Sequence, residues 1–409
     1  MEQDGFILRK LEQGDIEEFD ELFRYAFQVT DKEMERTGWT NPAMKRSKAP
    51  VFDSSYVLGW FFEGHLASQI VVYPMKINIH GRIYDMGGVT GVATYPEYTG
   101  HGLMHSLIRK SLEHMRLQHQ SISFLCPYSI PFYRKQGWEV CSDKLTFTVK
   151  DTQLPDRKDV GGMIRRVDPH DDEDVLKVWK YFALQHHGAL LRGKLEWQEY
   201  WRWETDDVMG AVYYDSRNKP IGFIVYYIED DIFKIKEVVY LSMEAKNGLW
   251  NFISAHFSMV DKVIGDNYSG EPIAFQFEDS EITETIEPYI MARIVDAESF
   301  MRQYPFRLTG EHTDFYFQIT DHDAGWNQGT FYVGIMPENG RQICRKVDDK
   351  EADPKRLVKL DIGTLTAMLM GYKRPMYLYN NERIHMNYNL LKELEQAIPG
   401  EKPYFSDYF

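Results

Sequence analysis

Apolar residues in one part of the chain change from a strand pattern to a helix pattern across a turn that contains glycine. Residues 87–94 are mainly β-branched or small, which suits a strand. In residues 103–115 the apolar positions recur every three or four residues, the spacing of an amphipathic helix with one buried face. Pro96, Gly100 and Gly102 lie between the two segments. The sequence therefore predicts a strand, a tight turn and a helix in direct succession.

The glycines of this turn favour an anion-binding site. Glycine lets the backbone turn sharply and leaves the N–H groups at the start of the helix uncovered. Those groups point at whatever lies in front of the helix, most naturally a phosphate. The turn has neither the Gly-Lys-Ser/Thr of a Walker loop nor the third glycine of a dinucleotide fingerprint. On this turn alone, ordinary loop chemistry explains the two glycines equally well.

The sequence around the turn has the pattern of one complete domain, residues 1–155. A strand at residues 6–11 precedes a helix that opens at Asp15, and hairpins follow within residues 56–84. After the strand, turn and helix we expect a buried strand at 121–126, a short helix at 129–136 and a strand at 138–149.

A second stretch, residues 156–287, repeats this order of elements without the glycines. We predict strands at 163–167, 212–214, 221–228, 233–241 and 274–277, and helices that end near 182, at 194–203 and at 245–264. In place of the glycine turn it has residues 242–247, with Glu244 where a phosphate would lie. The sequence predicts a duplicated domain that has lost its anion site.

The remaining residues, 288–409, form a third predicted domain with an unusual end. We expect strands at 315–320, 329–336 and 342–346 and helices at 362–369 and 388–398. Chain ends are usually polar and frayed, yet this one is aromatic, with Tyr404, Phe405, Tyr408 and Phe409. Packing on a neighbouring surface is the simplest explanation of these side chains.

Composition narrows the classes of partner. The formal net charge of −15 argues against a nucleic-acid partner and favours a cationic small molecule, although acidic proteins also use charge to stay dispersed. Cys126, Cys141 and Cys344 are odd in number and share no metal-ligand spacing, so we expect reduced thiols in the cytoplasm. No leader or membrane-spanning run is apparent. His186 and His187 are adjacent and cannot easily converge on one ion, so we assign no metal.

Two motifs resemble the coenzyme A site of the GNAT acetyltransferases. The family loop reads Arg/Gln-x-x-Gly-x-Gly/Ala after a strand, and residues 99–104 match it except at Thr99 and Met104. The segment FYRKQGW, residues 132–138, resembles a second family pattern that follows the strand after the coenzyme helix. Both motifs occur in the family's order, together with the family's order of elements. Residues 1–155 therefore resemble an active GNAT domain.

The whole chain resembles the Eis (enhanced intracellular survival) N-acetyltransferases. The likeness rests on an active GNAT domain, a degenerate second one and a third domain whose residues 360–372, LDIGTLTAMLMGY, look like the family's sterol-carrier-like domain. It implies an α+β (mixed α/β) fold with domains at 1–155, 156–287 and 288–409. It also implies acetyl-CoA as acyl donor and a homohexamer built as a dimer of trimers.

The resemblance places roles on individual residues. It implies that Tyr133 protonates the leaving thiolate and that the terminal carboxylate of Phe409 acts as base. Coenzyme contacts fall on Val92, Ala93, Thr94, Gly100, His101, Gly102, Leu103, Met104, His105, Tyr128 and Ser129. In this frame His101 and His105 lie by the pyrophosphate rather than by the thioester.

Acyl transfer to an amine needs such groups on chemical grounds. An alkyl ammonium with a pKa of about 10.4 must lose a proton before it attacks, and a thiolate whose conjugate acid has a pKa of about 8.5 can take a proton from a phenol. A main-chain carboxylate, with a pKa of about 3.5, is a weak base but can orient the ammonium and pass its proton through water. We expect acetyl transfer to a primary amine of a cationic acceptor, such as an aminoglycoside, a polyamine or a lysine-like group.

Two other functions fit the same sequence. The chain could be a non-catalytic binding protein for acyl-CoA or a lipid, which the departures at Thr99 and Met104 would favour. It could also be an acyltransferase that uses a longer acyl-CoA, because the protein myristoyltransferases also join two GNAT domains and use a terminal carboxylate.

Overall fold

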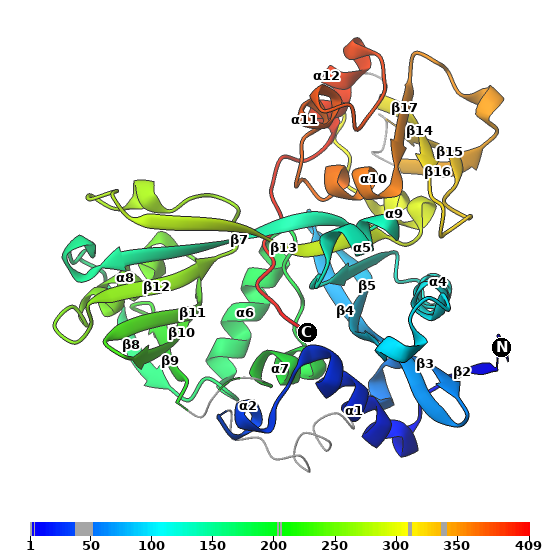
Figure 1. Cartoon of the computed structure of the whole chain (residues 1–409). Helices are drawn as coiled ribbons and strands as arrows, with labels where there is room; N and C mark the ends of the chain where they lie inside the picture. Colours follow the sequence, from blue (N-terminus) through cyan, green and yellow to red (C-terminus); the bar gives the residue numbers. More distant parts are fainter. Residues whose placement is uncertain are drawn as a thin grey trace. The chain divides into compact units, whose positions relative to one another are not determined.

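A computed structural model describes residues 2–3, 5–36, 52–202, 204, 207–309, 313–336 and 342–409 (Figure 1). The chain divides into two compact units. The first unit contains Met1–Cys141, Ile290–Glu401 and Phe409, and the second contains Ser142–Tyr289 and Lys402–Tyr408. Strands and helices are mixed in both units, so the α+β architecture expected from the sequence is confirmed. In the described ranges, no helix is both long and apolar enough to cross a membrane.

The first unit begins with a sheet that is antiparallel except for the pair β5 and β6. Its strands follow the order β1 (Glu2–Gln3), β2 (Phe6–Lys10), β3 (Tyr56–Phe62), β4 (His65–Ile79), β5 (Arg82–Thr94), β6 (Ile122–Leu125) and β13 (Thr283–Ile294). β6 runs parallel to β5, and β13 runs antiparallel to β6. The apolar face predicted for α4 (Leu103–Leu117) is buried, including Leu107 and Leu112. The helices α1 (Ile16–Phe27), α2 (Asp31–Arg36) and α5 (Ile130–Lys135) complete this part.

The first unit also contains a second, smaller sheet. Its strands are β14 (Thr313–Thr320), β15 (Gly329–Ile335), β16 (Gln342–Val347) and β17 (Leu357–Asp361), in the order β16-β15-β14-β17. Its helices are α9 (Ala297–Gln303), α10 (Ile362–Leu369), α11 (Pro375–Asn380) and α12 (Tyr388–Ala397). Every residue of α10 is buried, which fits its continuous apolar sequence and makes it the central helix of this part.

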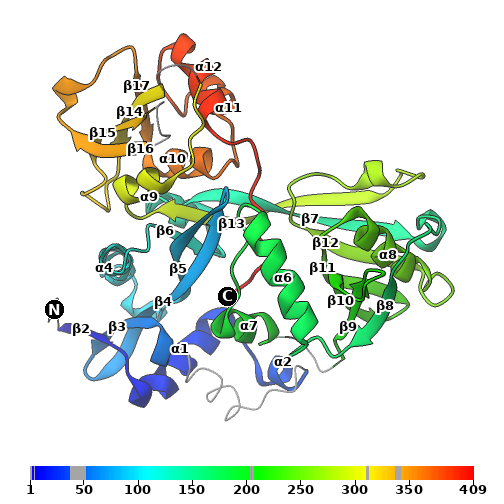
Figure 2. The ribbon, with the colours of Figure 1, turned by 180° about the vertical axis from the view of Figure 1, so that it is seen from behind.

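The second unit has one sheet covered on both faces. Its strands lie in the order β7 (Glu139–Lys150), β12 (Lys262–Asn267), β11 (Ile232–Tyr240), β10 (Pro220–Glu229), β9 (Met209–Tyr214) and β8 (Met163–Val167). Alternate residues of a strand face opposite sides, and Tyr213 packs with α8 (Met243–Ser254) whereas Tyr214 packs with α6 (Glu173–Gln185). These two helices therefore cover opposite faces of the sheet, as Figure 2 also shows. α7 (Lys194–Trp201) follows α6.

Two elements predicted for the second unit are wrong. The helix predicted at 245–264 ends at Ser254, and Lys262–Asn267 form the strand β12 between β11 and β7. The strand predicted at 274–277 is a short 3-10 turn, Ala274–Gln276. Apolar residues at helical spacing continued past Ser254, but the two neighbouring strands need a partner there, and this pairing overrides the local pattern.

The hairpin between β4 and β5 buries an ionisable group at its turn. His80 has a positive φ of 47°, and the side chain of Asn78 accepts a hydrogen bond from Gly81 N at 2.7 Å. Burial is the largest cause that lowers the pKa of His80, to about 4, and the charges of Arg307 and Arg374 act in the same direction. Below about pH 6.5 the unfolded chain binds a proton at His80, whereas His80 of the folded chain stays neutral down to about pH 4. Acid therefore favours the unfolded state.

We expect the stability of the first unit to fall in mild acid because of His80. The contribution of neutral His80 to the free energy of unfolding is fully present above about pH 6.5. It is lost progressively toward pH 4, by up to about 3 kcal/mol. His80→Asn keeps a residue that tolerates the left-handed conformation and removes the titration. Thermal unfolding measured between pH 7.5 and 4.5 should depend less steeply on pH in the variant, and parallel curves for both proteins would contradict this account.

Candidate functional site

Strands β5 and β6 separate soon after they meet. They pair only where Met86, Gly87 and Gly88 lie opposite Ile122, Ser123 and Phe124. β5 continues to Thr94, so from Val89 onward its edge on the β6 side has no strand partner among the described residues. Such an edge presents N–H and C=O groups in a row. An extended ligand with amide groups can pair with it as a further strand does.

A β-bulge lies in this unpaired part of β5. Gln69 pairs with Ala93 and Val71 with Thr90, so Gly91 and Val92 together oppose a single residue of β4. Gly91 has a φ of 59°, which favours glycine. On the β4 side, the hydroxyl of Ser68 donates to the carbonyl of Ala93 at 3.1 Å and lies 2.7 Å from Thr94 Oγ1. The bulge includes Val92 and directly precedes Ala93 and Thr94, which pair again with β4, and these three residues are the predicted pantetheine contacts.

The turn before α4 leaves the start of the helix open. Gly100 and Gly102 have φ values of 91° and 71°, and a Cβ at either position would meet nothing within 4 Å. Gly102 is the N-cap, and as a glycine it has no side chain that could cap the first turn. The hydroxyl of Thr99 bonds back to Pro96 O at 2.5 Å, so it does not replace the arginine or glutamine of the family loop. The backbone N–H groups at the positive end of the helix dipole can therefore bind an anion.

The other residues of this turn have distinct surroundings. Leu103 is buried and Met104 is half-buried in the core, so their backbone rather than their side chains faces a ligand. His101 is exposed, with its ring 5.3 Å from that of Phe6. His105 Nδ1 lies 2.9 Å from Gln136 Oε1, and its Nε2 lies 3.4 Å from Asp323. His105 thus joins α4 to two other loops.

Tyr133 is a buried residue of α5, the helix that follows β6. Its ring contacts those of Tyr128, Phe132 and Trp138, with centroids 5.5, 5.0 and 6.3 Å away. Burial, with smaller effects from Tyr128 and Cys126, raises the pKa of Tyr133 well above the ordinary value of 10. The phenol is therefore neutral at any physiological pH. In the described part of the chain its hydroxyl has no hydrogen-bond partner.

Two residues beside Tyr133 differ in exposure from it. Tyr128 is 65% exposed, and Ser129 is the N-cap of α5, but its side chain makes no capping hydrogen bond. Both side chains are accessible to a ligand at the carboxyl end of β6.

A buried arginine that sequence reasoning missed fixes the turn after Tyr133. Arg293 on β13 makes two 2.8 Å hydrogen bonds to the carboxylate of Asp321 and donates to the carbonyl of Gln136. A Cβ at Gly137 would lie 1.9 Å from Arg293 Nη1. The glycine of the FYRKQGW segment is thus required twice, by its φ of 84° and by the guanidinium beside it. No motif signals Arg293, because its partners are distant in the sequence.

The last residue lies where β5 and β6 separate. A Cβ at Gly88, the last residue of β5 that pairs with β6, would lie 3.0 Å from the ring of Phe409. The ring is also 6.1 Å from that of Tyr73 and is largely buried. Tyr133 belongs to the same hydrophobic cluster as Val89 and Leu125, the residues just beyond the paired segment. The structure therefore places the ring of Phe409 beside Gly88, one residue before Val89 of that cluster.

Within the second unit, residues 402–408 are held by a buried charge. Arg192 makes two hydrogen bonds to Glu237, at 2.8 and 2.9 Å, and a third to Asp407 at 2.7 Å. The hydroxyl of Ser406 donates to Glu237 at 2.7 Å, and that of Tyr289 donates to Asp407 O at 2.9 Å. These contacts fix the residues immediately before Phe409, and sequence reasoning did not identify them.

The helix start of the second unit that corresponds to α4 is closed. Ser242 caps α8 by accepting a hydrogen bond from Ala245 N at 3.2 Å. The carboxylate of Glu244 accepts one from the hydroxyl of Tyr213 at 3.0 Å. The second domain therefore fills with its own side chains the position that the first leaves open to an anion.

Models of known protein families match three parts of the chain. An acetyltransferase (GNAT) domain matches residues 8–141, another acetyltransferase (GNAT) domain matches residues 188–294, and a sterol carrier protein domain matches residues 297–406. A comparison with curated protein sequences finds no match.

Solved structures resemble the chain over nearly its whole length. A probable N-acyltransferase of unknown function from Enterococcus faecalis is 28% identical, with 99% of each chain covered and a TM-score of 0.88. A GCN5-related N-acetyltransferase from Anabaena variabilis is 22% identical, with 99% and 100% covered and a TM-score of 0.85. Eis1 from Mycobacterium abscessus is 16% identical, with 98% and 100% covered and a TM-score of 0.81, a likeness of fold. Most of the chain thus consists of two acetyltransferase (GNAT) domains followed by a sterol carrier protein domain, in the order expected from the sequence.

Proposed function

We propose that the first domain binds acetyl-CoA between the diverging strands β5 and β6 and transfers its acetyl group to a primary amine. The unpaired edge of β5 beyond Gly88, next to an uncapped helix start, is the observation that carries this proposal. Backbone groups of Val92, Ala93 and Thr94 hold the pantetheine arm. The N–H groups of residues 100–105 hold the pyrophosphate. Tyr128 and Ser129 make further contacts.

Tyr133 and the terminal carboxylate of Phe409 carry the proton transfers in this proposal. The carboxylate of Phe409 takes a proton from the ammonium through water, and the neutral amine nitrogen then attacks the thioester carbonyl. The C–S bond breaks, and the nitrogen loses its second proton to solvent. The leaving thiolate then takes the proton of the Tyr133 phenol. Burial raises the pKa of Tyr133 and keeps the phenol protonated in the resting site, and a thiolate that develops in the same buried surroundings has its own conjugate-acid pKa raised, which favours the transfer.

The acceptor that we propose is a cationic amine, such as an aminoglycoside, a polyamine or a lysine-like group. The net charge of −15 supports a positively charged partner through long-range attraction. We further propose that the protein works in the cytoplasm as a homohexamer, with domains at 1–155, 156–287 and 288–409. Release of free thiol from acetyl-CoA with a panel of amines tests the activity. The same assay with longer acyl-CoA donors tests which acyl-chain length the enzyme prefers.

Gly102→Val should abolish detectable coenzyme binding. A β-branched residue resists the left-handed conformation at the N-cap and moves the first N–H groups of α4, with a strain of about 1–3 kcal/mol. Gly64→Val is the matched control, because Gly64 also has a positive φ, 90°, and open space around it, but lies in the β3–β4 hairpin. Calorimetry with CoA should show binding in the control alone, and equal affinity in both variants would refute the assignment of the turn.

Tyr133→Phe should slow turnover by about 10²–10⁴ while coenzyme affinity stays the same, because only the acidic proton is removed. Tyr56→Phe removes a hydroxyl of the same domain outside the site and should leave turnover unchanged. Single-turnover rates separate chemistry from product release. A Tyr133→Phe enzyme with the normal rate of the chemical step would make this tyrosine a packing residue.

Two residues added after Phe409 should inactivate the enzyme. Extension converts the terminal carboxylate into a neutral amide and leaves the ring in place. Phe409→Leu keeps the carboxylate and most of the apolar volume, so its effect should be milder, and the same two residues at the N-terminus should have none. Coenzyme binding and the melting temperature check that each variant is folded. Full activity after C-terminal extension would exclude the carboxylate as base.

A further inference from the structure

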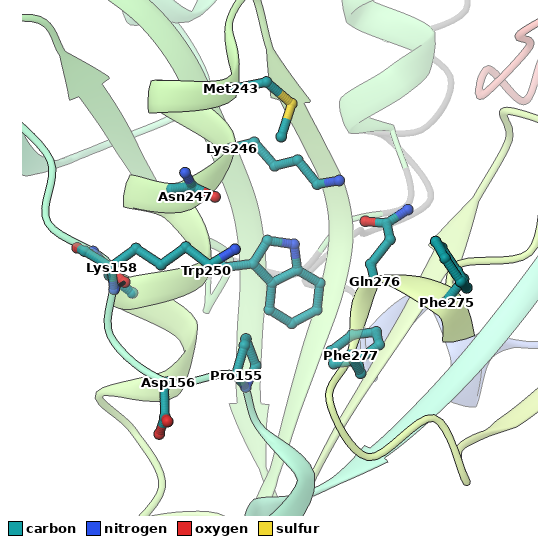
Figure 3. Close-up of a pocket in the computed structure, with 11 residues that line it drawn as sticks. Pro155, Asp156, Lys158, Met243, Lys246, Asn247, Trp250, Phe275, Gln276 and Phe277 are labelled. Atoms are coloured by element: carbon teal, nitrogen blue, oxygen red, sulfur yellow. Dashed lines mark hydrogen bonds between the residues drawn. The ribbon is translucent and has the colours of Figure 1, made fainter.

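A pocket of about 280 Å³ lies on the outer side of α8 in the second unit. Figure 3 shows its wall, made by one face of the helix together with Pro155, Asp156, Lys158 and residues 275–277. The helix contributes Met243, Lys246, Asn247, Trp250 and Asn251, which recur at the spacing of a single helix face. The site proposed for acyl transfer uses none of these residues.

Aromatic and apolar side chains form most of this pocket. The indole of Trp250 and the ring of Phe277 meet edge to face, with centroids 5.1 Å apart and planes at 89°. Pro155 and Met243 extend the apolar surface. Phe275, at the rim, is 97% exposed, which is unusual for a phenylalanine and leaves its ring available to a bound molecule. A flat apolar ring fits the corner between Trp250 and Phe277.

Two lysines place positive charge at the same pocket. Lys246 and Lys158 both line it, and among the described residues neither ammonium group is within ion-pair distance of a carboxylate. Two ammonium groups at one pocket, next to the rings of Trp250 and Phe277, favour an external anion as its occupant.

The lysines are held close to each other. Asn251 accepts a hydrogen bond from Lys158 N at 2.9 Å and donates one to Lys158 O at 2.7 Å, which ties residue 158 to α8. Burial, together with the charge of Lys158, lowers the pKa of Lys246. An anion between the two ammonium groups relieves this repulsion. Asp156 also lines the pocket, so a single negative charge fits better than several.

We propose that this pocket binds a small aromatic monocarboxylate, with its ring against Trp250 and Phe277 and its carboxylate between Lys158 and Lys246. The volume lies at the lower end of the range for ligand pockets, which suits one ring with a short acid arm. The ring of the ligand would cover the exposed Phe275, and its carboxylate would neutralise part of the charge of the two lysines.

Calorimetry on the full chain tests the proposal, with 3-phenylpropionate as probe and 3-phenylpropionamide as its neutral counterpart. We expect saturable binding of the acid, with at least tenfold weaker binding of the amide. The double variant Lys158→Gln, Lys246→Gln should weaken binding of the acid at least tenfold. Lys219→Gln, which removes a lysine of the same unit outside the pocket, should leave it unchanged.

A second variant and a competition experiment locate the binding. Phe275→Ser changes an exposed side chain without cost to the core and should weaken binding several-fold. Saturating CoA should not displace the acid, because the proposed coenzyme site lies in the other unit. Absence of saturable binding, equal affinity for acid and amide, unchanged binding in the double lysine variant, or displacement by CoA would each overturn the proposal.

Discussion

The buried guanidinium of Arg293 is the interaction on which the geometry of the first unit's site depends. It joins β13 to Asp321 in the smaller sheet's loops and to the carbonyl of Gln136 at the end of α5. The side chain of Gln136 in turn holds His105 on α4. Loss of one partner from a buried ion pair costs about 3–5 kcal/mol, because the other charge is left without compensation. The helix that carries Tyr133 and the helix that starts at the glycine turn are therefore positioned by one charge.

A second buried arginine fixes the end of the chain in a comparable way. Arg192 is fully buried among the rings of Trp179, Trp197 and Tyr200 and pairs with two carboxylates. Burial opposes ionisation of both carboxyl groups, but the charge of Arg192 outweighs it at Glu237, whose pKa is lowered. At Asp407 burial prevails and the pKa is raised. The tail forms neither helix nor strand, and residues 404–407 gain a fixed conformation from these bonds.

The sequence predicted those parts of the site that depend on local pattern. The strand at 87–94, the glycine turn and the helix from Leu103 follow from side-chain spacing and from the φ angles that Gly100 and Gly102 supply. The same reasoning placed the helix of Tyr133. It could not find Arg293, whose partners lie 28 and 157 positions away, or the bond between Arg192 and Asp407, which spans 215 positions. It also failed at β12, where pairing with two strands overrides a helical spacing.

Two strands separate in the second domain as they do in the first, but the chain's own residues fill the opening between them. β11 pairs with β12 only at residues 232–235, although β11 continues to Tyr240, so these strands separate as β5 and β6 do. Glu237 lies just beyond the last pair, and its carboxylate binds Arg192 and Ser406.

The tail lies at this opening of the second domain. The ring of Tyr404 packs 6.1 Å from that of Tyr268, the residue that follows β12. The separation of strands that the first domain offers to an extended ligand is thus occupied in the second by the chain's own residues 404–407. A coenzyme arm and the tail cannot both use one opening. In the second domain, side chains thus close the start of α8, and residues 404–407 fill the opening between the separating strands.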